Sequence, residues 1–163
     1  MESAGAQKSP QPWPPLASLL PHRPPMLLLD GVERFETGLI ECGVTPRAGG
    51  PFVEDDRVPA LVSVEYFAQA AATYFGLVHR DRGGMRIGVL LGARELRLEV
   101  DSFPVDAPMT ARVREVWTDG QIAQFDCELR GRAGELLASA SINVHSAPPS
   151  SSLGGGAPAP EAS

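Results

Sequence analysis

The chain contains few of the features that mark disulfide-rich, nucleic-acid-binding or membrane-spanning proteins. Only two of its 163 residues are cysteines, too few for a disulfide framework. Fourteen lysines and arginines against twenty aspartates and glutamates give a formal net charge of −6, a poor match to DNA or RNA. No apolar run approaches the roughly 20 residues of a membrane span, and no hydrophobic signal region follows the N-terminus. We therefore expect a cytoplasmic protein that binds no nucleic acid and does not cross a membrane.

Motifs for metals and nucleotides are also missing. The sequence has no cluster of metal-ligand spacing, no glycine-rich phosphate loop and no Gly-x-Ser-x-Gly elbow. Cys42 and Cys127 lie in strand-like alternation, so we interpret them as small buried apolar residues rather than as a catalytic thiol or a disulfide. We expect neither a metal nor a cofactor, so any chemistry should depend on acid and base side chains.

Both ends of the chain are low in complexity, whereas the middle is not. Residues 1–15 and 147–163 are rich in Pro, Gly, Ser and Ala and have no apolar periodicity. Such segments cannot bury enough apolar surface to offset their ordering entropy, so we expect two disordered tails. Residues 16–146 should then form a single domain.

One long helix is predicted in the middle of this domain. Pro59 suits its start, and the glycine pair at 83–84 suits its end, which gives about six turns. The apolar residues at helical spacing are Leu61, Val64, Ala68, Ala71, Ala72 and Phe75.

The remaining segments read as strands. Residues 26–37 and 38–46 predict a hairpin that turns near Thr37 and Gly38. After the helix, alternation predicts a four-stranded meander over residues 96–100, 109–117, 123–130 and 136–145. An antiparallel sheet that buries one face against a single helix would most simply wrap around that helix, which is an α+β fold.

Glu65 is the candidate catalytic carboxylate. It lies at the margin of the apolar stripe of the helix, and Gln69 lies one turn later on the same margin. A carboxylate there is costly to bury without a partner. The alternative is that Glu65 only rims the core and reaches solvent.

His22 is the candidate histidine. The prolines around it restrict the backbone to extended or turn conformations. His79 at the helix end and His145 on the polar face of the last strand are interpreted as structural or solvated. An isolated histidine is more often structural than catalytic, so the residues alone leave the role of His22 open.

Three segments together resemble a known family. LPHRPPMLLLDGV, VPALVSVEYFAQAAATYFGL and IGVLLGARELRLEVDSFPVDAPM are similar to the hot-dog-fold 3-hydroxyacyl-[acyl-carrier-protein] dehydratases, and most similar to the divergent aryl-polyene-type group. The resemblance extends over about residues 16–146. It implies a hot-dog fold, in which an antiparallel sheet wraps around one long central helix.

The resemblance also assigns roles to single residues. The family's catalytic acid stands six residues after a proline and four before a glutamine, which matches Pro59, Glu65 and Gln69. The family's catalytic histidine stands fourteen residues before the acid, where this chain has Pro51. The resemblance therefore implies Glu65 as general acid, and His22 is the histidine that we expect to replace the missing base.

The expected substrate is a 3-hydroxyacyl thioester on acyl carrier protein, which would lose water to become the trans-2-enoyl thioester of fatty-acid or polyene-type lipid biosynthesis. Amides at the helix start near Ala60 would polarise the thioester, and the phosphopantetheine arm would enter past Arg94 or Arg23. The expected substrate-binding residues are Gln69, Pro59, Ala60 and Arg94. The family also implies a homodimer, or a heterodimer with another hot-dog protein. The alternatives are a non-catalytic hot-dog partner subunit of a heteromeric dehydratase and an acyl thioesterase.

Overall fold

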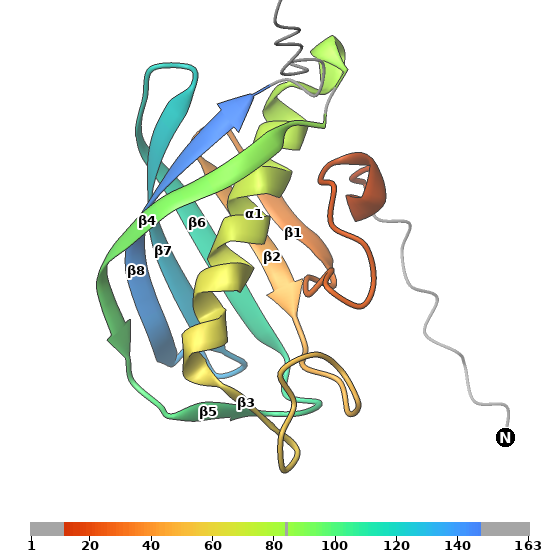
Figure 1. The fold of residues 1–163 in the computed structure, drawn as a ribbon, viewed down its shortest axis with the longest axis vertical. Coiled ribbons are helices and arrows are strands. Elements are labelled where there is room, and N and C mark those ends of the chain that lie inside the picture. The colour runs from red at the N-terminus through yellow and green to blue at the C-terminus, as the bar shows by residue number, and fades with distance from the viewer. Residues whose placement is uncertain (1–11, 84, 148–163) are drawn as a thin grey trace, which may run out of the picture.

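The computed structural model describes residues 12–83 and 85–147, which form one curved antiparallel sheet around a helix (Figure 1). The helix α1 (Ser63–Val78) lies against the concave face of the sheet. The strand order is β1-β2-β6-β7-β8-β4. The six strands are β1 (Gly31–Glu36), β2 (Leu39–Val44), β4 (Ile87–Leu98), β6 (Met109–Thr118), β7 (Ile122–Gly131) and β8 (Leu136–Ala147). This architecture confirms the predicted α+β class.

The opening hairpin turns where the sequence predicts it. Strands β1 and β2 are joined at Thr37 and Gly38, and Gly38 has the positive φ of 86° that a tight turn requires. Its N–H donates to the hydroxyl of Tyr74 on α1 at 3.0 Å, which ties the turn to the helix. Strand β1 begins only at Gly31, so the proline-rich segment before it lies outside the sheet, and its Leu28 donates a backbone hydrogen bond to Gln69 on α1.

The helix is shorter than the six turns predicted. It has 16 residues, and a 3₁₀ turn precedes it (η2, Ala60–Val62) and another follows it (η3, Arg80–Arg82). Pro59 caps η2, and Gly83 closes η3 in the left-handed conformation. Periodicity cannot separate a 3₁₀ turn from an α-helical one over three residues, which is why the predicted helix is too long.

The predicted four-stranded meander is wrong in one respect. Strands β6, β7 and β8 do form a meander, but β4 pairs with β8 at the sheet edge and not with β6. Instead β6 pairs with β2 of the opening hairpin. Strand β4 also begins at Ile87, earlier than predicted. The alternation of apolar and polar residues shows which face of a strand is buried but not which strand lies beside it. It therefore could not predict that β4 pairs with β8.

A second, two-stranded sheet lies beside the start of the helix. It pairs β3 (Arg57–Pro59) with β5 (Ser102–Pro104). The N–H of Ala60 donates to the carbonyl of Asp101 at 2.9 Å, which ties η2 to the segment leading into β5. Neither short strand was predicted.

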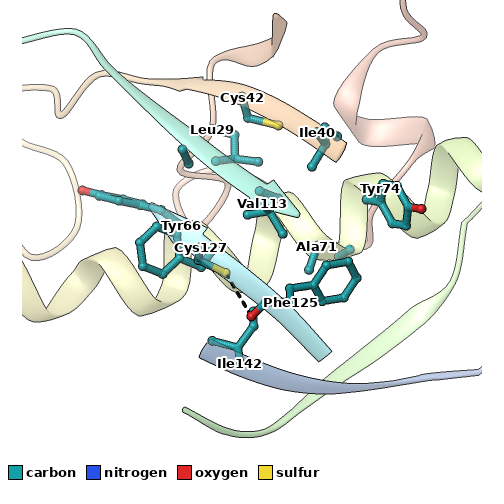
Figure 2. Packing of buried hydrophobic residues seen from close by; sticks show 14 of the residues in the cluster. Leu29, Ile40, Cys42, Tyr66, Ala71, Tyr74, Val113, Phe125, Cys127 and Ile142 are labelled. Atoms are coloured by element: carbon teal, nitrogen blue, oxygen red, sulfur yellow. Dashed lines mark hydrogen bonds between the residues drawn. The ribbon is translucent and has the colours of Figure 1, made fainter. Parts of the chain in front are cut away.

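The core lies between α1 and the sheet (Figure 2). Phe67 of α1 and Phe125 of β7 are completely buried there. Cys42 and Cys127 are 0% and 2% exposed, and burial raises the pKa of both thiols, so they behave as the apolar residues predicted. Among the described residues, no helix has the length and apolar character needed to cross a membrane.

Candidate active site

His22 and Glu65 meet at the surface of the helix. The His22 Nε2 atom lies 3.4 Å from Glu65 Oε1, and the two side chains are 31% and 36% exposed. Glu65 is in the first turn of α1, whereas His22 precedes the first strand of the sheet. The fold therefore brings together a carboxyl group and an imidazole that are far apart in the sequence, in a place that solvent or substrate can reach.

The segment before β1 holds His22 in place through its own backbone. The guanidinium of Arg23 donates to the carbonyls of Leu20 and His22 at 3.0 and 2.8 Å. Leu20 is fully buried and anchors the segment in the core. The Nδ1 atom of His22 is buried and has no hydrogen-bond partner within residues 12–83 and 85–147. Only its Nε2 edge is therefore available, and that edge is directed at Glu65.

Gln69 stands behind the pair and is completely buried. Its Nε2 group donates to Glu65 Oε1 at 2.9 Å and to the carbonyl of Met26 at 2.7 Å. Its Oε1 atom accepts the N–H of Leu28 at 2.9 Å. The predicted neighbourhood of Glu65 and Gln69 is confirmed by this hydrogen bond, while direct contact of Gln69 with substrate stays a prediction.

The other predicted binding residues lie at two separate places. Pro59 is exposed in β3, and Ala60 is buried with its own N–H already donated to Asp101. Polarisation of a thioester therefore stays a prediction for the neighbouring amides of the helix start. Arg94 is exposed on β4 opposite Ser141. No hydrogen bond or ion pair in the described part of the chain joins Arg94 to the histidine–glutamate pair.

A largely apolar cavity of about 230 Å³ lies at the start of the helix, lined by residues near His22 and Glu65 in the chain but by neither of the two, and the sequence analysis missed it. Val62 and Tyr66, which precede and follow Glu65 in the chain, line the cavity, and so does Pro25, three residues after His22. Phe52 lines the cavity from the loop before β3, as does its neighbour Pro51. The available signal was the aromatic residue directly after Glu65 in VSVEYFAQ.

Tyr66 gives the cavity a polar group. Burial, with a smaller contribution from the charge of Asp30, raises the pKa of Tyr66 to about 12. The tyrosine is 3% exposed, and Figure 2 shows its hydroxyl directed away from the buried cluster. The cavity thus combines mostly apolar walls with the Tyr66 hydroxyl and the ion pair of Asp30 and Arg47, which suits a ligand with a large apolar part and a polar end.

Comparison with known proteins decides the family. The sequence model of the ApeP-like family, described as ApeP dehydratase, matches residues 14–153. The chain belongs to this dehydratase family. Two curated relatives are 3-hydroxyacyl-[acyl-carrier-protein] dehydratases named FabZ. The one from Clostridioides difficile (strain 630) is 28% identical over 119 residues, which cover 69% of this chain and 82% of the relative. The one from Anaeromyxobacter sp. (strain K) is 31% identical over 130 residues, which cover 72% and 83%.

Solved structures confirm the hot-dog fold for this member of the ApeP-like family. The dehydratase heterocomplex ApeI:P from Xenorhabdus doucetiae matches with a TM-score of 0.77 and 26% identity, covering 83% of this chain and 92% of the other. A hypothetical thioesterase with coenzyme A from Streptococcus pneumoniae TIGR4 matches with a TM-score of 0.56 and 10% identity, covering 72% and 84%. At that identity the second match supports the fold alone.

Proposed function

We propose that this ApeP-like protein removes water from a 3-hydroxyacyl thioester carried by acyl carrier protein and forms the trans-2-enoyl thioester. The observation that carries the proposal is the 3.4 Å contact between His22 and Glu65, together with a largely apolar cavity lined by Tyr66, the residue after Glu65. The carriers named for the FabZ relatives favour a carrier-bound substrate. Fatty-acid or polyene-type lipid biosynthesis is the setting that we infer for the reaction.

The proposed chemistry moves one proton onto the protein and one off it. His22 Nε2 takes the proton from the carbon next to the thioester carbonyl, and that electron pair forms the new double bond. The hydroxyl on the next carbon leaves with the proton of the Glu65 carboxyl group as water. The result is an imidazolium next to a carboxylate, and their short separation stabilises the charges that develop during the reaction.

The direct test is an assay of the purified protein with a 3-hydroxyacyl carrier protein, followed by intact-mass spectrometry. We expect loss of one water in the wild type. Glu65→Gln should lower the rate by about 100-fold or more, because a positioned acid contributes about 10² to 10⁴ to such steps. If His22→Ala keeps the wild-type rate, His22 is not the base. Release of the free acid instead of the enoyl product would show a thioesterase and contradict the proposal.

A second candidate is that this chain forms half of a heteromeric dehydratase. To act as a base at Nε2, neutral His22 must carry its proton on Nδ1, which is buried without an acceptor among the described residues. Burying an Nδ1–H group without an acceptor is unfavourable. It favours the tautomer in which His22 carries its proton on Nε2 and donates it to Glu65, so that the base comes from another chain. Activity that appears only when a second hot-dog protein is added would support this candidate.

The heteromeric candidate requires a surface where two chains meet, and the family resemblance implies a dimer for the first candidate as well; we propose that β4 provides this surface. It is an edge strand of the sheet, so one row of its backbone groups has no neighbouring strand. Its exposed apolar residues are Ile87, Val89, Leu90, Leu91 and Leu98. An edge of this kind favours pairing with a second hot-dog domain, whether the same chain or another.

A further inference from the structure

The buried amide of Gln69 can adopt only one orientation. Its Oε1 atom accepts the N–H of Leu28, so its two N–H groups must face Met26 and Glu65. If the amide were flipped, its NH₂ group would face the N–H of Leu28 and its oxygen would face the carbonyl oxygen of Met26, and neither contact is favourable. Both N–H groups of Gln69 are therefore used within the protein, and none remains to bind a substrate.

This orientation makes the two oxygens of Glu65 unequal. Oε1 receives the N–H of Gln69 at 2.9 Å and lies 3.4 Å from His22 Nε2, whereas no hydrogen bond to Oε2 is found within residues 12–83 and 85–147. A proton on Oε1 would be directed at His22 Nε2, 3.4 Å away, and would not be available to a substrate. A proton that Glu65 exchanges with the substrate is therefore carried by Oε2.

We propose that Gln69 is a positioning residue that reserves Oε2 of Glu65 for proton exchange with the substrate. Its hydrogen bond to Oε1 also stabilises the carboxylate that is left when the proton has gone. The proposal rests on the proposed dehydratase function. In this proposal Gln69 does not bind the substrate directly, as the sequence analysis expects, but acts on it through Glu65.

Gln69 also couples Glu65 to the segment that carries His22. The same amide group binds the backbone of Met26 and Leu28, which follow His22 closely in the chain. The position of the imidazole and the orientation of the carboxyl group therefore depend on one buried side chain. Its loss should disturb the pair without removing either member.

The test compares Gln69→Met with Thr73→Val as a matched control. Thr73 is equally buried one turn later, and its hydroxyl donates to the backbone carbonyl of Gln69, so Thr73→Val removes a buried hydrogen bond without touching Glu65. We expect Gln69→Met to lower kcat by about tenfold to 100-fold, since hydrogen bonds to charged groups contribute on that scale. KM should stay within about threefold, because Gln69 does not contact substrate. Thr73→Val should lower stability and leave kcat of the folded enzyme unchanged.

Two measurements do not depend on activity. The N–H of Leu28 should exchange faster with solvent in Gln69→Met than in Thr73→Val, and the ¹³C signal of the Glu65 carboxyl carbon should move only in Gln69→Met. If Gln69→Met does not fold, Gln69→Glu serves in its place, because it keeps an acceptor for Leu28 but presents no amide donor to Glu65.

The outcomes separate the two proposals. A wild type that stays inactive both alone and with a second hot-dog protein, together with a shifted carboxyl signal in Gln69→Met, would overturn the dehydratase function but not the orienting effect of Gln69 on the Glu65 carboxyl group. An active wild type in which Gln69→Met keeps the wild-type kcat would overturn the positioning role alone. A rise in KM without a fall in kcat would point to direct binding of substrate by Gln69 and would also overturn it.

Discussion

Burial controls the ionisation of several single residues around the core. Both tyrosines of the chain, Tyr66 and Tyr74, lie in or beside it. Burial raises the pKa of Tyr66 to about 12, and it also raises the pKa of Tyr74 despite the N–H that Gly38 donates to its hydroxyl. Folding therefore keeps these hydroxyl groups protonated at a pH where an unfolded tyrosine, which ionises near pH 10, has released its proton.

This shift predicts alkaline destabilisation. Between about pH 10 and pH 12 the unfolded chain binds fewer protons than the folded one, so the free energy of unfolding falls as the pH rises. Urea unfolding at about pH 9 and pH 11 should show the fall, and Tyr66→Phe should reduce it. In the native protein, absorbance at 295 nm should show little tyrosinate at pH 10.5. Full ionisation of both tyrosines there would contradict the prediction.

At the scale of elements, the placement of His22 depends on how closely two segments approach. A Cβ atom built on Gly76 would lie 2.3 Å from the carbonyl oxygen of Leu19, in the buried segment that leads to His22. That oxygen belongs to the backbone, so it cannot turn aside as a side chain does. The glycine in α1 is thus required by packing and not by helix geometry, in which glycine is unfavourable.

Gly76→Ala should therefore push the segment around Leu19, which leads to His22, away from the helix. We expect a loss of about 1 to 3 kcal/mol in the free energy of unfolding, the usual cost of overpacking, together with a lower dehydration rate as His22 moves from Glu65. Chemical denaturation and the mass-spectrometric assay measure the two effects. Gly92→Ala is the control, because a Cβ atom there meets nothing within 4 Å. Equal stability and equal dehydration rates in the two variants would show that the close approach of Gly76 and Leu19 does not position His22.

At the scale of the whole molecule, exposed apolar residues on β4 predict assembly. Leu91 on this edge strand is 56% exposed. The purified chain of 17.3 kDa should have about twice that mass in solution, as in a two-fold dimer. Leu91→Glu should shift the mass toward the monomer, because a charge would be buried in the interface.

Light scattering coupled to gel filtration measures the mass in solution and so tests this prediction. Trp117→Glu is a suitable control, since Trp117 is 53% exposed but lies on β6 at the far end of a hairpin. A dimer that both variants leave intact would show that β4 is not the interface. A monomeric wild type that assembles only with a second hot-dog protein would support the heteromeric candidate.

The amino-acid sequence by itself determined the features that depend on neighbours in the chain. The hairpin turn at Gly38, the central helix, the burial of Cys42 and Cys127 and the alternation of β6, β7 and β8 all follow from local backbone restrictions and periodicity. His22 and Glu65 could be selected one at a time on the same basis. Their chemistry was suggested by the family resemblance, not by any local rule.

The tertiary structure alone decided which distant groups meet. Packing placed β4 beside β8, His22 Nε2 against Glu65 Oε1, and the Gln69 amide between the helix and the lead segment. Periodicity carries no information about such contacts, because they depend on the fit of side chains between segments that the chain does not connect directly. The sequence therefore singled out the two candidate groups, and the fold determined that they lie at one place and that Oε2 of Glu65 has no hydrogen-bond partner among the described residues.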